Sequence, residues 1–183
     1  TIDAECDHSR GYDEMVFGRC PNGSEWGVGY IARTLSDHDL KGIFFMEAMG
    51  SKRYGMQGLR DAVDTVSSYG HEVQLHLHPS FNGGVDAMHQ YDLQGQVSLI
   101  RMGKDILKQC GVHEIAAFRA GSFSADLTTL KAVNQCRIPF DSSYNLNYEN
   151  TNSRIRLGYS LNSPTRIESL WEFPVTCFNW PFY

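Results

Sequence analysis

The sequence lacks any long hydrophobic run: no apolar stretch comes near the roughly 18 residues that indicate a transmembrane helix, so we expect no membrane span. It also lacks an excess of basic residues. Sixteen lysines and arginines stand against 21 aspartates and glutamates, which gives a formal net charge of −5. Because nucleic-acid binding draws its affinity from a basic surface, we expect no nucleic-acid partner.

Short cysteine pairs are missing as well. The cysteines stand at 6, 20, 110, 136 and 177, and no two have the C-x-x-C spacing of a zinc knuckle or a redox motif. Cys110 and Cys136 fall in apolar helical patterns and are expected in the core. A bridge between Cys6 and Cys20 stays open. The number is odd, so at least one cysteine is free or pairs between chains, and cysteine usage does not fix the compartment.

The composition, with 42% hydrophobic and 20% charged residues among 183, is that of a globular protein. A chain of this length can bury the core of one domain, so we predict a single domain over residues 1–183. No signal peptide is visible, which slightly favours a cytoplasmic location. Because Thr1 is not an initiator methionine and residues 1–2 resemble the middle of a strand, we expect the domain to be truncated at both ends.

Short apolar runs alternate along the chain with stretches of helical periodicity. Apolar residues three or four apart, such as Val28, Ile31 and Leu35, indicate helices. We expect helices after Ser24, which can act as an N-cap, around 59–66 with an end at Gly70, over 93–111, and around 127–133. We expect strands at 1–5, 42–46, 71–78, 115–118, 138–141 and 170–175. The polar stretches 7–22 and 145–168 are expected to be irregular.

Strands that alternate with helices predict an α/β fold with a mostly parallel sheet. Right-handed crossovers bring the C-terminal ends of parallel strands to one edge, where α/β proteins place their active sites. Four unusual polar clusters stand at such ends: D-A-E at 3–5, H-L-H-P at 76–79, R-A-G at 119–121 and D-S-S-Y at 141–144. We therefore predict one site built from these clusters.

His76 and His78 are two residues apart on a predicted strand, so both side chains point to one face. Asp3 and Glu5 have the same spacing. Two imidazoles and one carboxylate make a metal site with a position left for water or substrate, as in catalytic zinc sites. The second carboxylate can then accept a proton, and Arg119 can orient it by a bidentate contact. The spacing leaves open which carboxylate takes which role.

These segments resemble the motifs of the polysaccharide deacetylases, the NodB-homology domains of carbohydrate esterase family four. Residues 1–5, T-I-D-A-E, look like the first motif of the family, T-F-D-D, and residues 70–76, G-H-E-V-Q-L-H, resemble G-H-E-I-G-N-H. The segment F-R-A-G at 118–121 is similar to the third motif, R-x-P, and 141–144 stands where the fourth motif lies. The resemblance extends from residue 1 to about residue 176.

The resemblance implies a distorted (β/α) barrel with seven or eight mostly parallel strands. It also implies a metal-dependent hydrolase that removes N- or O-linked acetyl groups from a carbohydrate, acting on carbon–nitrogen bonds in the amide case. Zinc is the first candidate for the divalent metal. The implied metal ligands are Glu5, His76 and His78, the implied catalytic residues are the base Asp3 and its partner Arg119, and the predicted substrate contacts are Gly121, Asp141 and Tyr144.

The sequence departs from the family pattern in three places. The family's second motif places its two histidines four residues apart, whereas His76 and His78 are two apart. Ala4 separates two carboxylates that are adjacent in the family, and the final L-x-x-H motif, which supplies the general acid, has no match before Tyr183. Two alternatives therefore stay open: a metal-independent amidohydrolase acting on small C–N substrates, and an inactive carbohydrate-binding relative. The sequence does not fix the sugar or the oligomeric state.

Overall fold

The computed structural model describes residues 1–6, 11–148 and 152–177. Within these ranges, seven strands form one sheet in the order β1-β2-β3-β4-β5-β7-β6. The strands are β1 (Ile2–Ala4), β2 (Ile43–Glu47), β3 (Glu72–Leu77), β4 (Ala117–Ala120), β5 (Phe140–Asp141), β6 (Thr165–Ile167) and β7 (Leu170–Glu172). All neighbours pair in parallel except β6, which runs antiparallel to β7. The predicted α/β fold with a mostly parallel sheet is confirmed.

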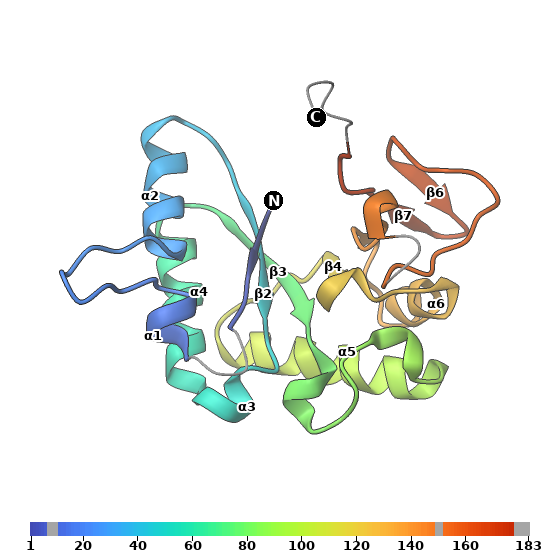
Figure 1. Ribbon diagram of the computed structural model, residues 1–183, viewed down its shortest axis with the longest axis horizontal. Coiled ribbons are helices and arrows are strands. Elements are labelled where there is room, and N and C mark those ends of the chain that lie inside the picture. Colours follow the sequence, from blue (N-terminus) through green and yellow to red (C-terminus); the bar gives the residue numbers. More distant parts are fainter. Residues whose placement is uncertain (7–10, 149–151, 178–183) are drawn as a thin grey trace.

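The helices follow an arc around the strands, from α2 and α4 through α5 to α6 (Figure 1). They are α1 (Tyr12–Met15), α2 (Val28–Asp37), α3 (Ser51–Tyr54), α4 (Met56–Ser68), α5 (Leu93–Gln109) and α6 (Leu127–Gln135). Short 3-10 helices are η1 (Pro79–Asn82), η2 (Met88–Gln90), η3 (Gly121–Phe123) and η4 (Leu146–Tyr148). None of the helices in the described ranges is long and apolar enough to cross a membrane.

The pleat of β3 divides its side chains between the helices and the site. Leu75 and Leu77 are fully buried and meet α5, where a Cβ added to Gly103 would lie 2.6 Å from a Leu77 methyl group. Successive residues of a strand point to opposite faces, so Gln74 and His76 lie on the face away from α5. Burial of the leucines against the helix therefore fixes the face to which His76 points.

Several helix and strand boundaries agree with the periodicity of the sequence. Helix α4 stops just before Gly70, which adopts the left-handed conformation with φ +72°, and α5 stops before Gly111 with φ +91°. Glycine is suited to this position because it lacks the Cβ that penalises positive φ. Cys110 and Cys136 are buried, as expected. Strand β4 starts two residues later than predicted, which places Arg119 within the strand.

The predicted capping role of Ser24 is wrong. Helix α2 begins after Gly27 and has no side-chain cap. Ser24 instead bonds within its own turn, with its hydroxyl 2.7 Å from the Asn22 side-chain oxygen and 3.2 Å from the Trp26 indole nitrogen that donates to it. Serine hydroxyls readily form such local contacts, which compete with a capping role.

Two further expectations are corrected, and the open question of a Cys6–Cys20 bridge is answered. The stretch 7–22, expected to be irregular, contains α1, and 145–168 contains η4 and strand β6. Elements of three or four residues are too short to show a period, so their pattern was not visible in the sequence. Cys6 and Cys20 are both free, so the bridge between them is not formed. Residues 7–10, part of the same predicted loop, lie outside the described residues.

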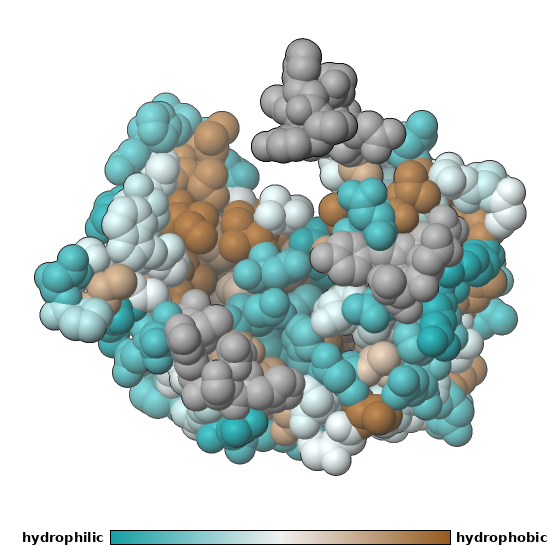
Figure 2. All heavy atoms as spheres, viewed as in Figure 1, coloured by the Kyte–Doolittle hydropathy of each residue, from teal (hydrophilic) through white to brown (hydrophobic). Residues whose placement is uncertain are grey.

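The sheet ends at β1 on one side and β6 on the other, and no pairing between these two strands closes it in the ranges that the structure describes. Closure of the predicted barrel is therefore not confirmed. On the face away from the helices, a cavity of about 250 Å³ is lined by apolar side chains that include Ile43, Phe45 and Phe173. Hydrophobic side chains also gather beside α2 in the view of Figure 2.

Candidate metal centre

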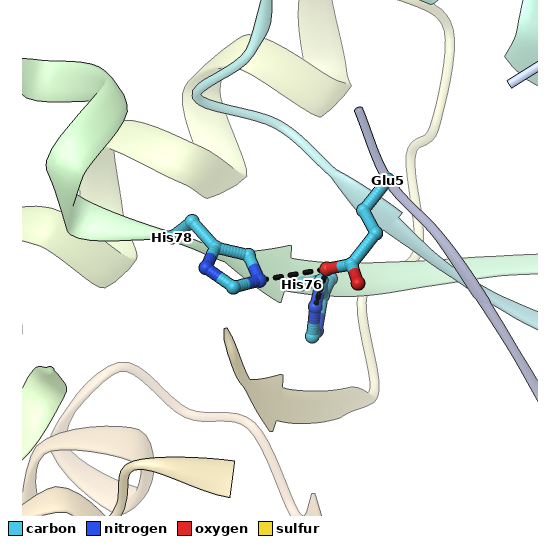
Figure 3. Close-up of side chains that lie close together, drawn as sticks. All are labelled: Glu5, His76 and His78. Atoms are coloured by element: carbon cyan, nitrogen blue, oxygen red, sulfur yellow. Dashed lines mark hydrogen bonds and ion pairs between the residues drawn. The ribbon is translucent and has the colours of Figure 1, made fainter. Parts of the chain in front are cut away.

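Three potential metal ligands converge where β1 and β3 end. Glu5 follows β1, His76 is the penultimate residue of β3, and His78 follows that strand. Glu5 Oε2 lies 3.0 Å from His76 Nε2 and 2.6 Å from His78 Nε2, and one ligand atom from each residue lies within 4.8 Å of the others (Figure 3). The structure thus brings together the three residues that the sequence suggested as ligands.

The chemistry of this set suits a divalent cation of the zinc type. Ligand atoms bound tetrahedrally at 2.0–2.2 Å lie about 3.3 Å apart, so Glu5 Oε2 has to withdraw by about 0.3 Å from His76 Nε2 and about 0.7 Å from His78 Nε2 to admit an ion. The histidine side chains are 2% and 13% exposed, whereas the Glu5 side chain is 45% exposed. The two imidazoles therefore form the fixed part of the site and Glu5 the adjustable part.

Each imidazole uses its Nδ1 atom for a contact outside the site. His76 Nδ1 lies 2.9 Å from the carbonyl oxygen of Arg119, to which an N–H at this position donates. His78 Nδ1 lies 3.2 Å from both carboxylate oxygens of Asp86. In both residues Nε2 is the atom that faces Glu5. Metal-binding histidines usually show this pattern, because the outer hydrogen bond fixes the tautomer and the ring orientation.

The charges of the cluster depend strongly on one another. Hydrogen bonds from His76 and His78 hold the pKa of Glu5 well below its ordinary value. Burial lowers the pKa of His78, but hydrogen bonds with Asp86 and Glu5 outweigh it and raise the pKa to about 10. The His78 hydrogen bond also lowers the pKa of Asp86 to about 2. Without an ion, His78 is therefore protonated at neutral pH, and a metal has to displace that proton.

An ion pair between Asp3 and Arg119 borders the same site. Arg119 Nη1 lies 2.6 Å from Asp3 Oδ1. The guanidinium is fixed from the other side by Ser142, whose carbonyl accepts from Nε at 3.0 Å and whose hydroxyl accepts from Nη2 at 2.8 Å. It also lies over the Phe45 ring, 4.2 Å from the centroid. Arg119 is only 5% exposed, so it holds the partly exposed Asp3 carboxylate in a defined position.

A pocket of about 260 Å³ gives access to these groups. It is lined by Asp3, Glu5, His76, Ala120, Ser122, Phe123 and Asn152. Ser122 and Phe123 have φ values of 52° and 53°, a left-handed conformation that costs non-glycine residues free energy. The following residue, Ser124, holds this wall in place, because its hydroxyl and carbonyl accept from the backbone N–H groups of Met88 and His89 in η2.

The three predicted substrate contacts lie in different environments. Gly121 packs against the site, where an added Cβ would lie 2.7 Å from two carbon atoms of the His78 ring. Asp141 and Tyr144 are 0% and 1% exposed and do not line the pocket. The Tyr144 hydroxyl accepts from the Leu161 backbone N–H at 3.3 Å. Substrate contact by these residues stays a prediction, and the burial of Asp141 and Tyr144 indicates a supporting role beneath the site.

Asp141 forms part of a buried carboxyl pair with Glu172. The two residues are register partners on β5 and β7, and both are fully buried. Burial raises the pKa of Asp141 to about 6 and raises the pKa of Glu172 well above its ordinary value. Ser143 donates to Asp141 through its backbone N–H at 3.0 Å and its hydroxyl at 2.9 Å. These bonds connect the pair to β4, because the Ser143 hydroxyl accepts from the Ala120 N–H.

Two acidic residues beside the site were not predicted from the sequence. Glu47, at the C-terminal end of β2, is 2% exposed and accepts from the His78 backbone N–H at 2.5 Å. Asp86 lies in the loop between η1 and η2 and contacts the His78 ring. Glu47 was detectable, because it is a polar residue ending a predicted strand, like Asp3 and His76. Asp86 had no such signal, since nothing in its loop indicates a contact eight residues back.

No protein-family model and no curated protein sequence matches the chain. Solved structures do match. A Mycobacterium smegmatis protein assigned as a polysaccharide deacetylase is 19% identical with a TM-score of 0.60, over 85% of this chain and 51% of that chain. A CE4 family pseudoenzyme from Bacillus anthracis is 19% identical with a TM-score of 0.50, over 62% and 38% of the two chains.

A mutant of that pseudoenzyme with restored enzymatic activity is 18% identical with a TM-score of 0.51, over 75% of this chain and 40% of that chain. The chain thus spans about half, or less, of the length of the structures it matches. At these identities the likeness establishes the fold. The chain has the α/β fold of the polysaccharide deacetylases of carbohydrate esterase family 4.

Proposed function

We propose that this protein is a metal-dependent hydrolase that removes acetyl groups from a carbohydrate. The observation that carries the proposal is the convergence of Glu5, His76 and His78 beside the Asp3–Arg119 ion pair, with Asp3, Glu5 and His76 lining one pocket. A metal-ligand set and a separate, oriented carboxylate are the two parts that a metal-assisted hydrolysis requires. The match in fold to deacetylases supports the same function.

In this proposal Glu5, His76 and His78 hold a divalent cation, with zinc as the first candidate. When bound, such a cation supplies Lewis-acid activation of water and of a carbonyl group. Asp3 acts as general base, because its carboxylate faces the pocket and stays free of the two imidazoles. A general base contributes typically about 10²–10⁴-fold to such a reaction.

Arg119 positions Asp3, because its bond to Oδ1 restrains the direction of the carboxylate. The pocket volume of about 260 Å³ suits a small group such as one acetylated sugar unit more than an extended chain.

Metal content and acetate release test the proposal together. Purified protein is loaded with zinc, dialysed, analysed for bound metal, and incubated with an acetylated oligosaccharide while acetate is measured. We expect about one ion per chain and acetate release that a chelator abolishes. His76→Ala should lose both, whereas His113→Ala, which changes an exposed histidine far along the chain, should keep both. Full metal binding by His76→Ala would refute the assignment of the site.

One observation favours a second candidate function. Pseudoenzymes occur among the structures of this fold, and the spacing of His76 and His78 departs from the usual pattern of the active enzymes. A carbohydrate-binding protein without activity would bind the same oligosaccharide and release no acetate. A metal-independent amidohydrolase would instead retain activity in the presence of the chelator. Acetate release with and without the chelator, together with oligosaccharide binding and hydrolysis of small amide substrates, separates the three cases.

A further inference from the structure

We propose that Asp86 is a positioning residue that orients His78 as a metal ligand, an inference that rests on the proposed metal centre. The two histidines are supported differently. The His76 ring is buried within β3 and its Nδ1 meets a backbone carbonyl of the neighbouring strand. His78 lies one residue beyond β3, where the hydrogen bonds of the sheet no longer restrain it. Its Nδ1 meets the Asp86 side chain instead of a backbone carbonyl.

The loop after His78 brings Asp86 back to the His78 ring through several hydrogen bonds. After His78 the chain makes the 3-10 turn η1, and Gly83 follows with φ +83°. The Ser80 hydroxyl donates to Asp86 Oδ1 at 2.5 Å, and the Tyr91 hydroxyl donates to the Val85 carbonyl at 2.9 Å. These bonds fix the carboxylate so that both its oxygens lie 3.2 Å from His78 Nδ1.

Packing restrains the plane of the ring but does not choose which nitrogen faces the metal. Gly121 leaves no room beyond the ring on one side, and the rings of His76 and Phe81 meet it edge-on at 5.2 and 6.5 Å. A flip of the imidazole would keep most of this packing. The partners of the two ring nitrogens distinguish the orientations. Asp86 accepts from the Nδ1 N–H, and Nε2 then faces Glu5 at 2.6 Å, where a bound metal would take the place of its proton.

The same contact explains how a histidine two residues after His76 can serve as a ligand. The pleat places both side chains on one face, but the second one is past the end of the strand. A carboxylate outside a metal-bound histidine also strengthens the imidazole as a donor. Removal of such a partner typically costs 10–100-fold in metal affinity.

A double-mutant cycle on zinc affinity tests the inference. Zinc dissociation constants are measured at one pH by competition with a chromophoric chelator for wild type, Asp86→Asn, His78→Ala and the double variant. We expect Asp86→Asn to weaken zinc binding about 10–100-fold. In the His78→Ala background the same substitution should change almost nothing, because Asp86 acts only through that ring. Asp105→Asn, the same charge change at an exposed site on α5, is the matched control.

Three outcomes are informative. Equal zinc affinity of wild type and Asp86→Asn would overturn the inference and leave the metal centre standing. Equal effects of Asp86→Asn with and without His78 would also overturn it, because they would show a general electrostatic or structural effect. Failure of wild-type protein to bind zinc would overturn the proposed function and the inference with it. Circular dichroism of every variant verifies that each is folded.

Discussion

The buried Asp141–Glu172 pair predicts that the protein becomes less stable as the pH rises. Burial raises the pKa of Asp141 from its ordinary 3.8 to about 6, although hydrogen bonds from Glu172 and Ser143 and the charge of Arg119 oppose the rise. A carboxyl group with a raised pKa binds a proton more tightly in the folded state. Its cost to stability is therefore absent at low pH and grows as the pH rises from about 4 through about 6.

The size of this cost follows from the shift. The rise from 3.8 to about 6 corresponds to about 3 kcal/mol once the group is ionised in both states. About 2 kcal/mol of that falls between pH 4.5 and pH 8, because part is already lost at the lower value. Asp141→Asn removes this titration and keeps an oxygen for the Ser143 N–H. Its amide also offers a donor to Glu172 Oε2, which has no hydrogen-bond partner among the described residues.

Urea unfolding at the two pH values measures the effect. We expect the free energy of unfolding of Asp141→Asn, relative to wild type, to rise by about 2 kcal/mol from pH 4.5 to pH 8. Differences between variants cancel the titrations of groups remote from Asp141. The pKa of Glu172, which Asp141 raises, falls in the variant and shifts the difference in the same direction. Glu114→Gln, which removes an exposed carboxylate, should show no such change. If the free energies of unfolding of Asp141→Asn and wild type differ by the same amount at pH 4.5 and pH 8, a raised pKa of the buried Asp141 carboxyl is refuted.

Two further predictions concern the positioning of the site. Gly121→Ala should weaken zinc binding about tenfold or more, because the new Cβ would lie 2.7 Å from carbons of the His78 ring and force the ring to shift. Competition with a chelator measures the zinc affinity. An unchanged affinity would contradict the close packing of Gly121 against the ring. Arg119→Lys keeps the charge but loses the fork that contacts both Asp3 and Ser142. We expect it to lower the rate of acetate release about 100-fold with zinc binding retained, as measured on zinc-loaded protein.

The arrangement of the strands was largely predictable from the sequence, because alternation of strands and helices leaves few topologies. Parallel pairing then brings the ends of β1, β3 and β4, and with them D-A-E, H-L-H-P and R-A-G, to the same edge of the sheet, although β2 separates β1 from β3. Structural features that leave no hydrophobic periodicity in the sequence could not be predicted. Strand β6 has three residues, and the turn of Ser24 depends on hydrogen bonds to Asn22 and Trp26 that no spacing reveals.

The spacing of His76 and His78 shows how far strand periodicity can predict a ligand. Strand alternation correctly places both rings on one face, but it says nothing about a residue beyond the last ladder pair, which for β3 joins Leu77 to Ala120. There the backbone of His78 is held by Glu47 and its ring by Asp86. Glu47 ends β2 and could be suspected from the sequence, whereas Asp86 lies across a loop with no pattern of its own. The ring of a ligand outside regular structure therefore depends on a neighbour that only the folded chain identifies.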